Sequence, residues 1–171
     1  MSEYRREWMR VMVTREPRVF DSQMLMSLRQ GTSFFASTCL LAVGGLLALI
    51  GNVDPLVGVT ENIGHLESST GVLQTKLLLV LFLLCNAFLK FVWSNRVFGY
   101  CGVMMGAVPN DPEDPQVYVI AQKAAELNVR AALNFNRGLR SMYFALGAVA
   151  CLLYTSPSPR DQRGSRMPSS A

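Results

Sequence analysis

The feature that most constrains this chain is a stretch of nineteen residues, Thr32 to Ile50, without a charged side chain. A helix rises about 1.5 Å per residue, so roughly 20 apolar residues cross the hydrocarbon core of a bilayer. A buried helix of a soluble protein is apolar all round over only about 10–14 residues. The stretch therefore predicts a membrane-spanning helix and argues against a soluble core.

Two further apolar blocks support this fold class. The block from Leu77 to Trp93 opens with nine apolar residues and carries one charge, Lys90, near its end. The block from Ser141 to Leu153 has about two thirds of the length that a crossing helix needs. We predict an all-α, multi-pass transmembrane helical bundle with three spans, of which the last is truncated.

The distribution of basic residues predicts the orientation of the spans. Six arginines precede the first span, whereas residues 51–75 contain no Arg or Lys before the second begins. Basic residues return after the second span, starting at Arg96. Because Lys and Arg are retained on the cytoplasmic side, the N-terminal segment and the second loop are predicted to be cytoplasmic.

Composition and turn-forming residues then divide the chain. Pro17 predicts a break or kink, Pro115 a helix start near Asp114, and Gly138 a possible bend. The segments expected are a cytoplasmic interfacial helical segment (1–31), a transmembrane helix (32–51), an extracytoplasmic loop (52–75), a transmembrane helix (76–94), a cytoplasmic loop with an amphipathic helix (95–137), a truncated transmembrane helix (138–153) and a tail (154–171).

The tail places three arginines on the predicted outer side, against the charge rule. It resembles a peptide produced when library adaptor sequence is translated at the broken end of a reading frame, and we predict that residues 154–171 are not native. The alternative is a disordered tail rich in Ser, Pro and Arg. Half of the formal net charge of +4 lies in this tail, so basicity predicts no nucleic-acid partner.

The first candidate site is a polar face of the second span. Asn86, Lys90 and Trp93 have the spacing of one helix face, and Arg96 lies just beyond. A charge inside a membrane is costly and is by default a functional candidate. Alternatively, Lys90 snorkels to the cytoplasmic interface, where Trp93 joins the aromatic belt.

The second candidate lies at the cytoplasmic start of the third span. Asn136, Arg140 and Tyr143 share a helix face, and Arg137 forms a basic pair with Arg140. Such a cluster could bind an anionic lipid headgroup or a phosphate, or could simply anchor the span at the interface.

Other patterns predict structure more than chemistry. Arg18 and Asp21 have the i, i+3 spacing of a helical ion pair. His65 is the only histidine, the four cysteines form no C-x-x-C pair, and no phosphate-binding loop appears. We predict no catalytic residue, metal site or cofactor.

Three segments, in this order, resemble a mainly bacterial family of membrane proteins, domain of unknown function 599. They are R-E-W-M (Arg6–Met9) followed by D-S-Q and S-F-F-A-S-T, then A-F-L-K-F-V-W-S-N-R (Ala87–Arg96), then F-N-R-G-L-R with Y-F (Phe135–Phe144). The resemblance implies four transmembrane helices in the bacterial inner membrane, of which this chain would hold the last three. It implies no activity.

Our functional expectation is a non-enzymatic membrane component, either a scaffold or a protein that handles a small solute or lipid between the faces of Lys90 and Arg140. The expected partners are the lipid bilayer, anionic lipid headgroups and a second copy of the chain. The alternative is a membrane-embedded enzyme whose catalytic groups lie outside these segments.

Overall fold

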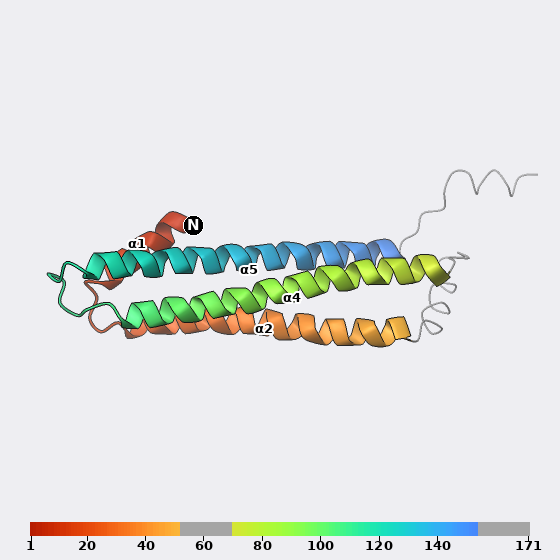
Figure 1. Cartoon of the computed structure of the whole chain (residues 1–171), viewed down its shortest axis with the longest axis horizontal. Helices are drawn as coiled ribbons and strands as arrows, with labels where there is room; N and C mark the ends of the chain where they lie inside the picture. Colours follow the sequence, from red (N-terminus) through yellow and green to blue (C-terminus); the bar gives the residue numbers. More distant parts are fainter. Residues whose placement is uncertain (52–69, 154–171) are drawn as a thin grey trace, which may run out of the picture.

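The computed structural model describes residues 1–51 and 70–153, and the regular structure in these ranges is helical throughout. The helices are α1 (Ser2–Met12), α2 (Val19–Gly51), α4 (Thr70–Gly106) and α5 (Val117–Leu153). Figure 1 shows α2, α4 and α5 side by side along the long axis, with consecutive helices running in opposite directions. The prediction of an all-α helical bundle is confirmed.

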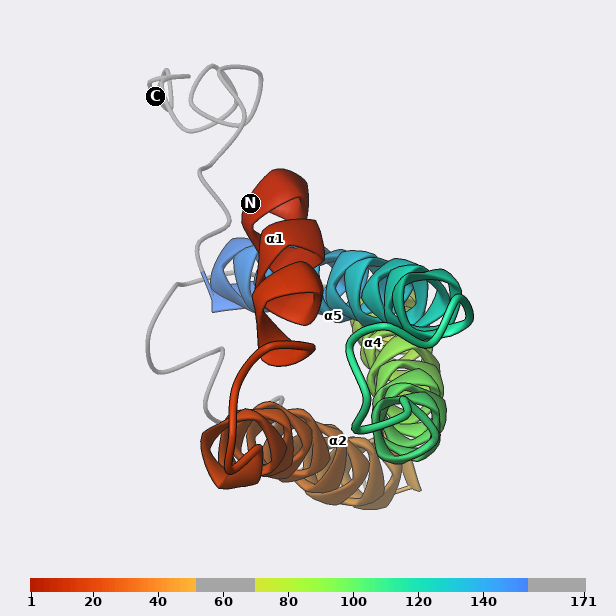
Figure 2. The ribbon, with the colours of Figure 1, turned by 90° about the vertical axis from the view of Figure 1, so that its left-hand side faces the viewer.

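α4 is the central helix of the bundle. It packs against both α2 and α5, and α1 packs against α5 (Figure 2). α2 has 33 residues and α4 and α5 have 37 each. At about 1.5 Å per residue these helices are about 50–55 Å long, well beyond the roughly 30 Å of a bilayer's hydrocarbon core.

The helices extend past the segments drawn from the sequence. α2 begins at Val19, so one helix joins the second part of the predicted interfacial segment to the predicted span at 32–51. α4 continues to Gly106, through residues expected in the loop at 95–137, and α5 passes Gly138 without interruption. These extensions form because tertiary packing stabilises helices whose composition is polar on one side.

Prolines mark the two described turns. Pro17 lies between α1 and α2, where it removes a backbone donor, and Pro109, Pro112 and Pro115 lie between α4 and α5. The carboxylate of Asp114 accepts a hydrogen bond of 2.8 Å from the backbone N–H of Gln116, just before α5. This agrees with the predicted helix start near Asp114. The tail at 154–171 and residues 52–69 of the predicted outer loop lie outside the described residues.

Buried apolar side chains form three clusters along the bundle. The largest lies where α1 and the adjoining ends of α2, α4 and α5 meet, and includes Met9, Leu25 and Phe98. The middle cluster surrounds Phe91, and the third joins Leu46, Leu77, Val80 and Ala145 near the other end. The end of the bundle that includes α1 therefore has a core to which all four described helices contribute. We call it the arginine-rich end, because Arg5, Arg6, Arg10, Arg29, Arg96 and Arg130 lie in the segments that form it.

Aromatic rings fill the middle of the bundle. Phe35 of α2 stacks on Phe91 of α4 with ring centroids 5.5 Å apart, and Phe135 of α5 contacts both rings at 5.6 and 5.4 Å. Such pairs contribute about 0.5–1.5 kcal/mol beyond the area that they bury. These ring contacts fix the positions of α2, α4 and α5 relative to one another in the middle of the bundle.

Candidate functional site

The two clusters predicted from the sequence occupy different surroundings. Asn86 is half-buried and donates a hydrogen bond of 3.0 Å from its amide to the hydroxyl of Ser141 on α5. That hydroxyl donates in turn to the carbonyl of Leu83 at 2.9 Å. Asn86 therefore belongs to the α4–α5 contact.

Most of the other predicted residues lie at the surface. Lys90 is half-buried, whereas Trp93 is 52% exposed and Tyr143 is 60% exposed. Asn136, Arg137 and Arg140 are also exposed. None of the described hollows is lined by Lys90 or by Arg140. A shared site between their faces remains a prediction.

The fold brings Arg96 together with an arginine that the sequence did not connect to it. Arg96 of α4 and Arg29 of α2 line the same open hollow of about 560 Å³, with Asn95, Gly99 and Tyr100. The Nε of Arg96 donates to the Tyr100 hydroxyl at 2.6 Å, and its guanidinium lies 5.7 Å from the ring centroid. The Nε of Arg29 faces Oδ1 of Asn95 at 3.4 Å.

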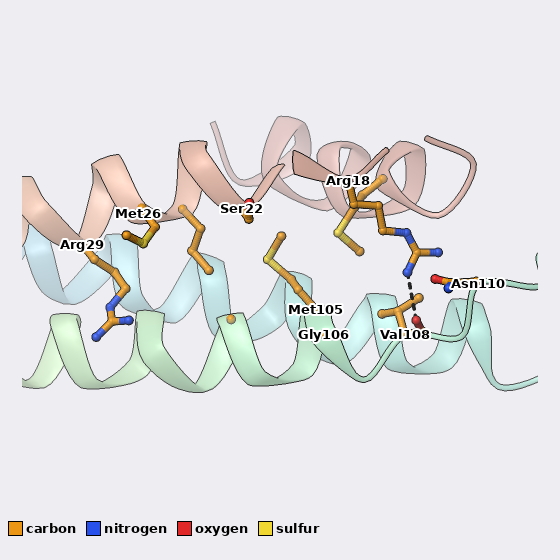
Figure 3. Close-up of a pocket in the computed structure, with 11 residues that line it drawn as sticks. Arg18, Ser22, Met26, Arg29, Met105, Gly106, Val108 and Asn110 are labelled. Carbon is orange, nitrogen blue, oxygen red and sulfur yellow. Dashed lines mark hydrogen bonds between the residues drawn. The ribbon is translucent and has the colours of Figure 1, made fainter. Parts of the chain in front are cut away.

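A second hollow, of about 410 Å³, continues from Arg29 along the α2–α4 groove (Figure 3). Arg29 lies at one end and Arg18 at the other, with Met26 and Met105 between them, and Leu25 also lines the hollow. Gly102 lets the helices approach, because a Cβ there would lie 3.1 Å from Cδ2 of Leu25. The groove is apolar in its middle and cationic at both ends.

Arg18 has a structural role at its end of the groove. Its Nη1 donates to the carbonyl of Val108 at 2.9 Å, and its Nη2 donates to the carbonyls of Pro109 (2.9 Å) and Val13 (3.3 Å). Figure 3 shows the bond to Val108 as a dashed line. Arg18 thus ties the α1–α2 turn to the α4–α5 turn, and much of its donor capacity is used in doing so.

The predicted pairing of Arg18 with Asp21 is wrong. Asp21 is fully buried, and its Oδ1 accepts hydrogen bonds of 2.6 Å from both Trp8 Nε1 and Arg15 Nη1. The helical spacing does not apply, because Arg18 precedes the first residue of α2 and points to the other turn. Trp8 belongs to the R-E-W-M motif of the family resemblance and Asp21 to the D-S-Q motif that follows it. The fold brings these two motifs into contact through the hydrogen bond between the indole and the carboxylate.

A further polar contact links α1 to α5. Arg5 donates to the side-chain carbonyl of Asn128, which is fully buried. Burial lowers the pKa of the Arg5 guanidinium, although an arginine stays charged at physiological pH. Arg5 also lines a hollow of about 410 Å³ between α2 and α5, which includes Asn136 of the second predicted cluster.

In the part of the chain that the structure describes, no group of three or more His, Cys, Asp or Glu side chains could hold a metal ion. The described cysteines are not in disulfide bonds: Cys39 and Cys101 are buried, Cys85 is half-buried and Cys151 is exposed. The chemistry that the described groove offers is recognition of an anion by guanidinium groups beside apolar surface.

Two of the described helices, Val19–Gly51 and Gln74–Gly106, are long and apolar enough to cross a membrane by length and composition. No curated protein and no solved structure matches the chain. One family model does match, over residues 1–158, so nearly the whole chain is covered. The chain therefore belongs to the family described as "Protein of unknown function, DUF599".

Proposed function

We propose that this chain is a multi-pass protein of the bacterial inner membrane that handles a small solute or lipid without catalysing a reaction. The observation that carries the proposal is the exposure of its most apolar helices. In the most apolar 18-residue stretch of each helix, only 6% of the stretch in α2 and 28% of the stretch in α4 is buried within the bundle. Core helices of a soluble protein would be mostly buried, so lipid is the medium that suits these surfaces.

The side chains on these faces support the same conclusion. Leu41 of α2 is 77% exposed and Phe82 of α4 is 69% exposed, in the parts of these helices that lie away from the arginine-rich end. Leaving such groups in water forgoes about 1.5–3 kcal/mol for each large apolar side chain. A bilayer removes this cost without a protein partner.

The charge distribution supports an orientation with the α1 end in the cytoplasm. Figure 1 shows that α1, the first part of α2, the end of α4 and the first part of α5 lie at one end of the bundle. These segments carry Arg5, Arg6, Arg10, Arg29, Arg96 and Arg130. That end has a packed core of its own, as expected of a part that stands in water. In this proposal residues 138–153 of α5, which pack along α4, form the third crossing segment.

The α2–α4 groove supports the handling of a ligand. It opens at the level where both helices leave the predicted spans, and it combines cationic ends with an apolar middle. The described residues that line it include no His, Cys, Asp or Glu. Binding, rather than bond making, is the activity that this groove fits.

The test is fractionation of the full chain after expression in a bacterial host. Membranes are collected and washed with alkaline carbonate, which strips peripheral proteins, and are then extracted with a mild detergent. The protein is expected to stay in the carbonate pellet and to become soluble only in detergent. Recovery in the carbonate supernatant would show that α2 and α4 do not cross the bilayer.

A further inference from the structure

We propose that Arg29 and Arg96 form a binding site for the phosphate of an anionic phospholipid at the cytoplasmic face of the membrane. This inference rests on the proposed membrane location and names the ligand of the groove. Arg29 comes from α2 and Arg96 from α4, and both line one shallow hollow.

The guanidinium groups are held in place but not neutralised. Arg96 is oriented by the hydroxyl and ring of Tyr100, and Arg29 lies over the α4 backbone at Gly99, where a Cβ would be 3.9 Å from its Cζ and Nη2. The described contacts use only the Nε of each arginine. The Nη donors remain available, and they are the atoms that form bidentate hydrogen bonds with phosphate oxygens.

The lining of the hollow favours an anion. It includes both arginines and the polar groups of Asn95 and Tyr100, and it contains no acidic side chain. The described ion pairs, Arg10 with Glu7 and Arg15 with Asp21, involve neither Arg29 nor Arg96. Two like charges placed on one hollow without a carboxylate are complementary to a phosphate, which can accept hydrogen bonds from both.

The depth of the hollow matches lipid headgroups. Arg29 precedes the predicted span at 32–51 by three residues, and Arg96 follows the span at 76–94 by two. At about 1.5 Å per residue both residues lie within about 5 Å of the hydrocarbon boundary, where phosphates are found.

Apolar side chains beside the arginines suit the rest of the ligand. Val92 lies one turn toward the membrane from Arg96, is 44% exposed, and lines the same hollow. The large exposed side chains of Leu89 and Phe82 continue along α4 in the same direction. An acyl chain can follow this surface into the bilayer, whereas a free phosphate would leave it uncovered, and we therefore commit to a lipid as the source of the phosphate.

The experiment titrates the detergent-purified full chain with dioleoyl-phosphatidylglycerol or dioleoyl-phosphatidylcholine and counts bound lipid by native mass spectrometry. The anionic lipid is expected to bind at least about tenfold more tightly than the zwitterionic lipid. The double variant Arg29→Gln/Arg96→Gln is expected to lose this preference, a change of about tenfold in Kd. A wild-type preference in that variant would overturn the proposal.

A matched control separates the site from general attraction to positive charge. Lys123→Gln/Arg130→Gln removes the same charge from two exposed residues of α5 that line no described hollow. It is expected to retain the preference of the unaltered chain, and loss of the preference in this control would show diffuse attraction instead. Arg29→Lys/Arg96→Lys keeps the charge without the planar fork and is expected to bind more weakly than the unaltered chain. Equal binding would indicate simple interfacial anchors.

A steric variant covers the possibility that the glutamine variant does not fold. Gly99→Leu places an apolar side chain in the hollow beside the Arg29 guanidinium, from which the Cβ alone would lie 3.9 Å, and it keeps both positive charges. It is expected to weaken binding of phosphatidylglycerol, and unchanged binding would contradict the site.

Glycerol 1-phosphate at millimolar concentration is expected not to compete with the lipid, and full competition would assign the site to a soluble phosphate. Recovery of the protein in the carbonate supernatant contradicts the membrane location, whereas the absence of a lipid preference in a chain that stays in the carbonate pellet contradicts only the lipid site.

Discussion

Gly138 of α5 lies directly against the ring of Phe91 of α4. A Cβ at position 138 would come within 2.8 Å of Cε1 and 3.0 Å of Cδ1 of that ring. Phe91 is fully buried and is stacked on Phe35, so it has little room to move. Glycine is required here by the close approach of two helices, and not by a bend in α5.

Gly138→Ala is therefore expected to destabilise the bundle by about 1–2 kcal/mol, since overpacking outweighs the gain in helix propensity. Thermal unfolding of the detergent-purified protein measures the effect. Gly147→Ala is the matched control on the same helix, because a Cβ there meets nothing within 4 Å, and it is expected to be neutral or slightly stabilising. Phe91→Leu should relieve the clash in the Gly138→Ala background. Equal unfolding temperatures for both glycine variants would contradict the packing described.

Asp21 holds α1 to the start of α2. Asp21→Asn removes the charge that Arg15 pairs with and weakens the acceptor that Trp8 uses, so we expect a loss of about 1–3 kcal/mol, discounted because Arg15 is partly exposed. The readout is hydrogen exchange of residues 2–12, which should become faster. The control is Glu7→Gln, which breaks only the exposed pair with Arg10. Unchanged exchange in the Asp21 variant would show that α1 is held by apolar contacts alone.

Arg18 is expected to keep the α1–α2 turn and the α4–α5 turn together. Arg18→Gln leaves the carbonyls of Val108 and Pro109 without their donors and is expected to cost about 1–3 kcal/mol. Hydrogen exchange in residues 107–116 should rise, while exchange in the middle of α4 should stay the same. Arg10→Gln provides a comparison at an exposed arginine. Protection of the α4–α5 turn in the Arg18 variant would contradict this role.

The fold class could be predicted from the sequence because a run such as Thr32 to Ile50 is apolar on every side. The residues at which the helices begin and end could not be predicted in the same way. Residues 19–31 and 95–106 carry the exposed charges Arg29 and Arg96. Their helical state depends on buried partners such as Leu25 and Phe98, which come from different segments. Pro17 was correctly predicted to interrupt a helix, because its effect is local.

The polar groups show the same division between local and distant information. Asn86 was recognised as unusual within an apolar block, yet its partner Ser141 lies 55 residues away. The sequence places Arg96 beside the first candidate site, whereas it indicates Arg29 only as one of the six arginines that precede the first predicted span. An arginine directly beside the end of each of two neighbouring spans is a sequence signal that could have paired them, once the helices were known to be adjacent.

The most direct test of the account is the side of the membrane on which each end of α2 lies. Ser22→Cys and Gly51→Cys, near the two ends of α2, are made separately in a chain whose own cysteines are replaced by alanine, and a membrane-impermeant maleimide is applied to spheroplasts and to inverted vesicles. We predict that Gly51→Cys is labelled in spheroplasts and that Ser22→Cys is labelled only in inverted vesicles. Labelling of both positions from the same side would contradict a membrane-crossing α2, and with it the location of the proposed lipid site.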